Sequence, residues 1–157
     1  MRLIATLRCA CVGLSLILLA AVPSRAAEFG TREEAQAMAG KAVDLIAAKG
    51  EAAFAAFEDA QGGFKDRDLY VFVYDLQGLN RSHGANKALI GKNLRGMKDV
   101  DGKLLIDEMI KLVSAGGEGW VDYKWQNPVT KKIEDKSSFV KKAAGDLFVG
   151  VGVYRTP

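Results

Sequence analysis

The sequence predicts an α+β fold, in which a long N-terminal helix lies beside a five-stranded antiparallel sheet with a loop and a helix inserted between the second and third strands. Three observations predict it. Residues 32–49 carry apolar side chains at helical spacing, residues 69–74 are apolar at every position, and three strand-like segments fill the C-terminal part of the chain. Helices that stand apart from a run of strands are typical of this class, in which they cover one face or end of the sheet.

The first 26 residues have the profile of a signal peptide. Arg2 and Arg8 precede an apolar or small-residue run over residues 9–22, and small residues lead up to Ala26. We expect cleavage after Ala26, which leaves residues 27–157 as a single domain in the periplasm or outside the cell. Retention as a membrane anchor is the alternative, although the run is shorter than the roughly 20 apolar residues that a spanning helix needs.

Removal of this segment changes the charge and the thiol content of the protein. It holds three of the 22 basic residues and none of the 19 acidic ones, so the mature domain has 19 of each and is near neutral. We therefore expect no nucleic-acid partner, because phosphate binding requires a clustered positive surface. Both cysteines, Cys9 and Cys11, are removed as well, so the domain cannot form a disulfide and depends on its hydrophobic core.

The first predicted helix begins with a capping box. Thr31 and Glu34 are spaced so that each side chain satisfies a backbone amide of the first turn. Gly50 supplies a left-handed residue at the end of the helix. The apolar stripe consists of Met38, Ala42, Leu45 and Ile46. A shorter helix is expected around residues 51–59.

The first predicted strand, residues 69–74, places aliphatic side chains on one face and Tyr70, Phe72 and Tyr74 on the other. Because both faces are apolar, this strand is predicted to be central. A tight turn leads to a second strand near residues 79–82, and a long polar loop follows.

The next helix shows an apolar stripe from Leu105 to Val113, and Asp99 or Asp101 can cap its start. Three strands, residues 120–126, 133–142 and 147–154, then complete the sheet. The last strand carries Gly150 and Gly152 on the same face, which leaves a hollow in the sheet. The hollow either accepts a helix backbone or makes room for a ligand, and the sequence favours neither.

Several segments follow one another in a fixed order along the mature chain. They are residues 70–78 (YVFVYDLQG), 81–83, 89–94, 98–103, 119–128, 136–142 and 148–154. Their order and spacing resemble the single-cache family of bacterial extracellular sensors over nearly the whole mature chain. The resemblance implies a PAS-like sheet with a long helix beside it, and a pocket between the sheet and the loop-helix insertion.

The resemblance also implies a function in sensing or signal transduction, such as chemotaxis, through binding of a small metabolite, above all a short organic acid. Carried over by position, the ligand-binding residues are Tyr123, Trp125, Lys136, Ser138, Phe139, Arg81 and His83. Cationic donors beside aromatic walls suit a carboxylate. Purely structural roles stay open: the aromatic pair can be core, the cations can be solvated, and His83 can brace its loop.

Catalysis is not expected, and neither is a metal or a cofactor. The chain has one histidine, and both of its cysteines are in the segment to be removed, so a nucleophile, base and orienting residue cannot be assembled, nor can a structural zinc site. Ser82 and His83 are adjacent and point to opposite faces of an extended segment. A carboxylate pair such as Glu118 and Asp122 is the remaining enzymatic alternative.

The chain ends soon after the last predicted strand. We therefore expect a free binding protein that acts through a separate membrane receptor, kinase or transporter. A homodimer through the N-terminal helix is a further expectation. The competing interpretation is a protein-interaction module or accessory subunit of a membrane complex that binds no small molecule.

Overall fold

The computed structural model describes residues 29–155, and the predicted signal peptide lies outside them. The elements are α1 (Arg32–Lys49), the 3₁₀ turn η1 (Gly50–Ala53), α2 (Phe54–Glu58), β1 (Lys65–Asp66), β2 (Leu69–Asp75), β3 (Asn80–His83), the 3₁₀ turn η2 (Lys87–Leu89), α3 (Leu105–Gly116), β4 (Glu118–Gln126), β5 (Ile133–Lys142) and β6 (Leu147–Arg155). The predicted α+β class is confirmed. None of the helices in residues 29–155 combines the length and the apolar character that crossing a membrane requires.

The sheet is antiparallel and has the strand order β1-β2-β6-β5-β4, with β3 paired to β2. All five predicted strands are present. The sixth strand, β1, is two residues long and exposed, which is too short to produce a recognisable hydrophobic pattern. Strand β2 is buried along its whole length and pairs with β6 as well as β3, as expected for a central strand.

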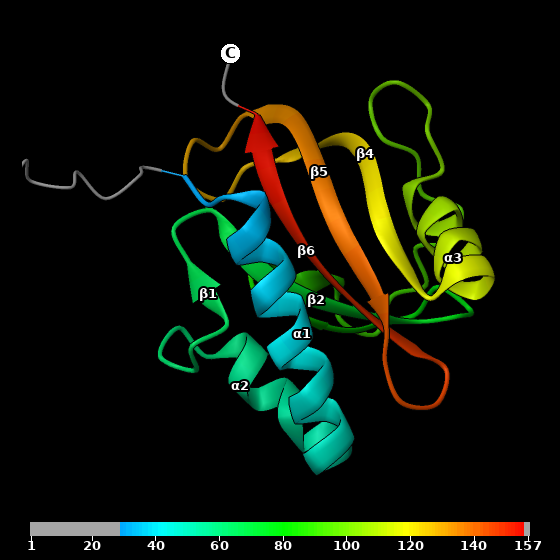
Figure 1. Ribbon diagram of the computed structural model, residues 1–157. Coiled ribbons are helices and arrows are strands. Elements are labelled where there is room, and N and C mark those ends of the chain that lie inside the picture. Colours follow the sequence, from blue (N-terminus) through cyan, green and yellow to red (C-terminus); the bar gives the residue numbers. More distant parts are fainter. Residues whose placement is uncertain (1–28, 156–157) are drawn as a thin grey trace, which may run out of the picture.

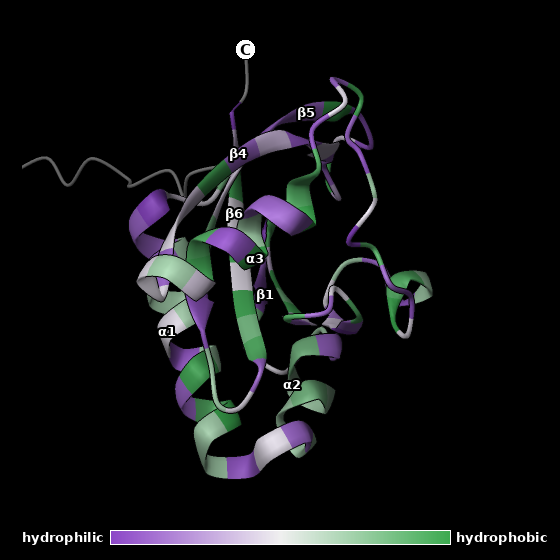
Figure 2. Ribbon diagram, turned by 90° about the vertical axis from the view of Figure 1, so that its right-hand side faces the viewer, coloured by the Kyte–Doolittle hydropathy of each residue, from purple (hydrophilic) through white to green (hydrophobic). Residues whose placement is uncertain are grey.

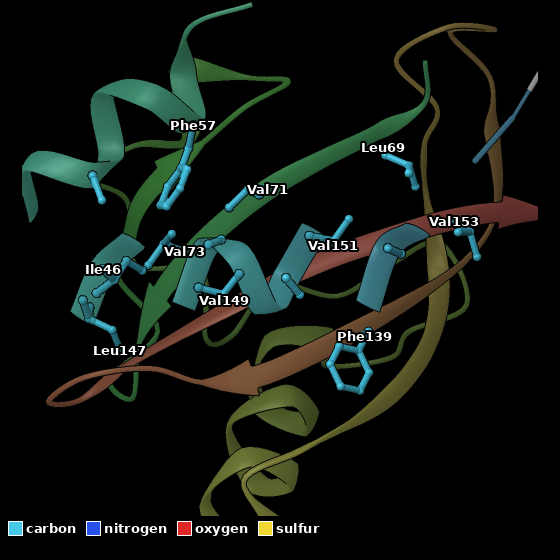
Figure 3. Close-up of a cluster of buried hydrophobic side chains, with 14 residues drawn as sticks. Ile46, Phe57, Leu69, Val71, Val73, Phe139, Leu147, Val149, Val151 and Val153 are labelled. Carbon is cyan, nitrogen blue, oxygen red and sulfur yellow. The ribbon is translucent and has the colours of Figure 1, made fainter. Parts of the chain in front are cut away.

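Helices α1 and α2 cover one face of the sheet (Figure 1). Valines of β2 and β6 pack there against the alanines and Ile46 of α1 and against Phe57 of α2 (Figure 3). The capping box of α1 is present, with Thr31 Oγ accepting from the Glu34 amide and the Glu34 carboxylate accepting from the Thr31 amide. Gly50 ends the helix at φ 58°.

Helix α3 and the long loop before it cover the other face. The helix buries one side, formed by Leu105, Ile106, Met109, Ile110 and Val113, and Figure 2 shows that it also carries hydrophilic segments. The prediction that Asp99 or Asp101 caps α3 is wrong, because Leu104 is the N-cap and makes no side-chain cap bond. Asp99 instead accepts the amides of Asp101, Lys103 and Lys124, so it fastens the loop to β4.

Candidate ligand-binding site

A small cavity lies between the sheet and α3. Its walls come from β2, β3, β4 and α3, and they consist of Tyr70, Phe72, Tyr74, His83, Leu105, Ile106, Met109, Tyr123 and Trp125. The volume of this cavity is about 10 Å³, which is room for about one water molecule. The cavity therefore exists before any ligand binds, and a molecule larger than water fits only if one of the walls moves.

Lys136 of β5 reaches into the aromatic walls of this cavity and exposes 2% of its surface. Its Nζ donates to the Tyr70 hydroxyl at 2.7 Å. The same nitrogen lies 4.0, 4.9, 5.5 and 5.9 Å from the ring centroids of Tyr70, Tyr154, Phe72 and Tyr123. A glycine on β6 makes this position available, because a Cβ on Gly152 would lie 2.3 Å from Cε of Lys136.

No ion pair within residues 29–155 compensates this buried amine. Asp68 is the carboxylate that influences it electrostatically, but the oxygens of Asp68 accept from the backbone amides of Gly30 and Tyr154. Burial lowers the pKa of Lys136 well below its usual value, and Asp68 opposes this effect only in part. The amine therefore lacks an anionic partner.

A chain of hydroxyl groups continues from Lys136. Tyr154 Oη donates to the Gln126 carbonyl at 2.8 Å, and it lies 3.2 Å from Tyr70 Oη. Because the Tyr154 hydroxyl donates its proton to Gln126, the Tyr70 hydroxyl must donate to Tyr154 while it accepts from Lys136. Burial raises the pKa of Tyr70 and Tyr154, so both phenols stay protonated at neutral pH.

Two more hydroxyls meet beside this chain. Tyr123 Oη lies 2.9 Å from Oγ of Ser138, and both side chains are buried. Burial raises the pKa of Tyr123 well above its usual value, and it raises the pKa of Tyr74 to about 12. The phenols of the cavity are therefore neutral hydrogen-bonding groups, and none of them supplies a negative charge.

His83 has a fixed tautomer. Its Nδ1 accepts from the backbone amides of Ala85 at 3.3 Å and Asn86 at 3.0 Å, so the ring proton lies on Nε2. Burial, followed by the charge of Lys136, lowers the pKa of His83 to about 3. The ring is thus a neutral donor that also holds the start of the long loop.

An outer groove of about 250 Å³ adjoins the cavity and shares Tyr70, His83 and Trp125 with it. Its remaining lining is Ala85, Asn86, Gln126, Pro128 and Lys131. The three shared residues form the wall between groove and cavity. Tyr70 and His83 are buried, whereas Trp125 is half-buried on the edge strand β4, so we expect Trp125 to be the part of the wall that moves most easily.

The structure brings five of the seven predicted site residues together. Tyr123 and Trp125 line the cavity with His83, and Lys136 and Ser138 are hydrogen-bonded to its tyrosines.

The two others need correction. Phe139 follows Ser138 on β5 and points to the opposite face, where it packs with Trp120 in the core beneath α1 (Figure 3). Arg81 lies at the surface in an ion pair with Glu51.

Several residues of the candidate site are not among those that the sequence predicts. Tyr70, Phe72 and Tyr74 form the aromatic face predicted for the first strand, and in the structure they are also walls of the cavity. The sequence does contain a signal for them. One strand has a face of three large aromatic residues and the last strand has a face with two glycines, so the aromatic side chains can fill the space that the glycines leave. The hollow at Gly150 and Gly152 is filled by Phe72 and by Lys136 with Ser138, so side chains of the site occupy it, not a helix backbone.

Comparison with known proteins shows that this chain is similar to bacterial sensor and chemotaxis proteins. A sequence model of the family described as Single Cache domain 2 matches residues 20–156. The sensor histidine kinase MctS of Rhizobium johnstonii is 43% identical over 89 residues, which cover 56% of this chain and 19% of the relative. The methyl-accepting chemotaxis protein McpP of Pseudomonas putida is 32% identical over 91 residues, which cover 57% of this chain and 16% of the relative.

Solved structures show the same fold. A methyl-accepting chemotaxis protein from Vibrio parahaemolyticus superimposes with a TM-score of 0.68 and 26% identity, covering 78% of this chain and 86% of that one. A periplasmic sensor domain of a chemotaxis protein gives a TM-score of 0.63 and 32% identity, covering 79% and 90%. A Cache chemosensory domain studied for carboxylic acid recognition gives 0.69 at 24% identity, covering 79% and 92%, which shows the fold alone.

Proposed function

The chain belongs to the Single Cache domain 2 family, and from this premise we propose that it is an exported sensor domain that binds a short monocarboxylate in the cavity around Lys136. Residues 27–157 form the ligand-binding domain in this proposal, after removal of residues 1–26 as a signal peptide. The domain binds its ligand and catalyses no reaction.

The observation that carries the proposal is the unpaired, buried Lys136. An isolated buried charge costs several kcal/mol unless an opposite charge and hydrogen bonds compensate it. A protonated amine has three N–H donors, and within the described residues the Tyr70 hydroxyl accepts one of them. A carboxylate supplies both the missing charge and the missing acceptors, so it fits this position better than a neutral ligand.

The surroundings of Lys136 favour a small ligand with one carboxylate. Aromatic rings and the apolar side of α3 exclude water, which strengthens a contact between the amine and a carboxylate. The hydroxyls of Tyr123 and Ser138 and Nε2 of His83 are further partners for ligand oxygens. Because the cavity is barely larger than water, an acyl chain of two or three carbons is favoured over a longer one.

The charge of the walls argues against amino acids and dicarboxylates. None of the residues that line the cavity in the described part of the chain is acidic, so an α-ammonium group has no partner there. A second carboxylate likewise meets no second buried cation, because Lys131 stands outside in the groove.

We further propose that the domain acts in sensing or signal transduction through a separate membrane receptor, kinase or transporter. Its relatives are a sensor histidine kinase and a chemotaxis receptor, and this chain spans 19% and 16% of their lengths. A homodimer through α1 belongs to the same proposal, and sedimentation of the purified protein tests it.

A non-ligand-binding interaction module is the second candidate, and the narrowness of the cavity favours it. A thermal-shift titration separates the two functions. The protein recovered after expression of the full chain is heated with acetate, propionate, butyrate, succinate or alanine. A ligand at 100 times its dissociation constant stabilises the folded state by about 2.7 kcal/mol, so acetate or propionate is expected to raise Tm by several degrees, while succinate and alanine do not.

The matched variants are Lys136→Met and Lys142→Met. Both positions lie on β5 and point to the same face, but Lys142 is exposed. Lys136→Met is expected to abolish the shift, and Lys142→Met is expected to keep it. No shift with any monocarboxylate would favour the interaction module.

A further inference from the structure

The amine of Lys136 is buried and donates a hydrogen bond to the Tyr70 hydroxyl. We propose that the cavity takes up its carboxylate together with one proton from solvent, so that a neutral amine on Lys136 becomes the ammonium half of a buried ion pair. This inference rests on the proposed function and specifies how the same site works. In the empty protein Nζ lies in a nearly dry aromatic cage without a carboxylate within ion-pair distance among the described residues.

The balance of energies in the empty cavity favours the neutral amine. Removing an ammonium from water carries a large free-energy cost even after the protein relaxes. The aromatic rings at 4.0 and 4.9 Å and the hydrogen bond to the Tyr70 hydroxyl recover part of this cost. These contacts do not replace a counter-ion. The lowered pKa of Lys136 agrees with this balance.

The other ionisable groups around Nζ cannot take the proton instead. Tyr70 of β2, Tyr123 of β4 and Tyr154 of β6 have raised pKa values and are already protonated. His83 of β3 has a pKa lowered to about 3, and its Nδ1 accepts two backbone amides.

Two further neighbours complete the surroundings of the amine. Asp68, before β2, is bonded to two backbone amides. Helix α3 contributes only Leu105, Ile106 and Met109 to the cavity. Lys136 is thus the group whose charge responds to the ligand near neutral pH.

The reaction is balanced without any other reagent. A carboxylate anion, a proton and a neutral amine combine into a carboxylate–ammonium pair, and no covalent bond other than the N–H bond forms. Carboxylic acids are ionised at neutral pH, since model carboxyls titrate near pH 4. The proton therefore comes from the buffer. Affinity for the anion consequently falls about tenfold for each unit of pH above the pKa of the empty site.

Calorimetry of acetate binding near neutral pH tests the inference. Titrations of the protein in phosphate and in Tris differ in heat by the number of protons taken up multiplied by the difference in the buffers' ionisation enthalpies. We expect close to one proton per ligand bound. His83→Asn keeps an acceptor at the place of Nδ1 but cannot titrate and lacks the Nε2 donor, so it is expected to bind acetate more weakly while the number of protons taken up per ligand bound stays the same.

Each other outcome has a defined meaning. Acetate binding without proton uptake would overturn the inference and leave the proposed function intact, because Lys136 would then be charged in the empty cavity. Uptake that disappears in His83→Asn would assign the proton to the imidazole and overturn the role of Lys136. Absence of binding for the whole set of acids would overturn the proposed function and the inference together.

Discussion

Gly152 of β6 and Lys136 of β5 share one space: a Cβ on Gly152 would lie 2.3 Å from Cε of Lys136 and 2.3 Å from Oγ of Ser138. The backbone of Gly152 is outside the left-handed region, so any residue could adopt its conformation. Glycine is required there because the lysine occupies the volume of a side chain. The position of the buried amine is therefore set by two strands that pair with each other.

The first prediction concerns Gly152→Ala. The atoms in its way are the ends of two side chains, so we expect the protein to fold while Lys136 and Ser138 are displaced from the cavity. Affinity for acetate is expected to fall at least about tenfold, or 1.4 kcal/mol, in calorimetry. Gly116→Ala is the control, because no atom lies within 4 Å of its Cβ. Unchanged affinity in Gly152→Ala would show that the placement of Lys136 does not determine binding.

The second prediction concerns stability and the buried lysine. The pKa of Lys136 in the folded protein lies well below its ordinary value of 10.5. At any pH between the folded pKa and 10.5, the unfolded chain therefore holds one more proton than the folded protein. Stability of the empty protein is then lower at low pH and rises with pH by up to about 1.4 kcal/mol per unit across this window. We expect Lys136→Met to remove this slope and to raise the free energy of unfolding near pH 6 by about 1–4 kcal/mol.

Urea unfolding at a series of pH values measures this effect. Lys142→Met serves again as the control, since an exposed lysine on the same strand is expected to keep the slope of the unaltered protein. A Lys136→Met protein that is less stable at every pH would mean that the amine is stabilised by its aromatic neighbours in the folded state.

The third prediction concerns acid stability. His83 has a pKa of about 3 in the folded protein and 6.5 as its reference value, so the unfolded chain binds the extra proton first as pH falls. Stability is expected to decrease through this window with a slope that approaches about 1.4 kcal/mol per pH unit. His83→Asn is expected to remove the contribution and still accept the amides of Ala85 and Asn86.

His83→Gln provides the contrast. Its amide oxygen lies near the place of Nε2 and leaves the two backbone amides without an acceptor, at a cost of about 1–3 kcal/mol. The contribution of His83 to the acid slope should disappear in both variants, while only His83→Gln loses stability at neutral pH. If the slope in His83→Asn is as steep as in the unaltered protein, His83 is not an acid-sensitive group.

Much of the fold was accessible from the sequence because it depends on local patterns. The capping box at Thr31, the alternation in β2 and the short turns between the last strands are each encoded within a few residues. The same alternation shows why Phe139 could not accompany Ser138: neighbours in a strand point to opposite faces.

The site was less accessible because its groups meet through strand order. Tyr70 and Tyr154 are 84 residues apart and lie within hydrogen-bonding distance only because β6 inserts between β2 and β5. No local pattern encodes that order. The sequence also could not show that the amine of Lys136 lacks a carboxylate, because this depends on what Asp68 contacts.

The last prediction concerns Trp125 as the movable part of the wall between cavity and groove. The chain has two tryptophans, and Trp120 lies under the Arg32 guanidinium, whose Cζ is 3.7 Å from the ring centroid. Trp120→Phe keeps an aromatic ring for Arg32 and leaves Trp125 as the sole tryptophan, whose fluorescence is excited selectively at wavelengths that tyrosine does not absorb. Because a carboxylate does not fit the empty cavity unless this wall moves, saturating acetate is expected to change quenching of Trp125 by acrylamide.

Removal of the Trp125 side chain in Trp125→Ala joins the groove to the cavity. This variant is expected to bind acetate more weakly and to have a smaller preference for acetate over butyrate. If quenching and chain-length preference both stay the same, ligands enter by another route.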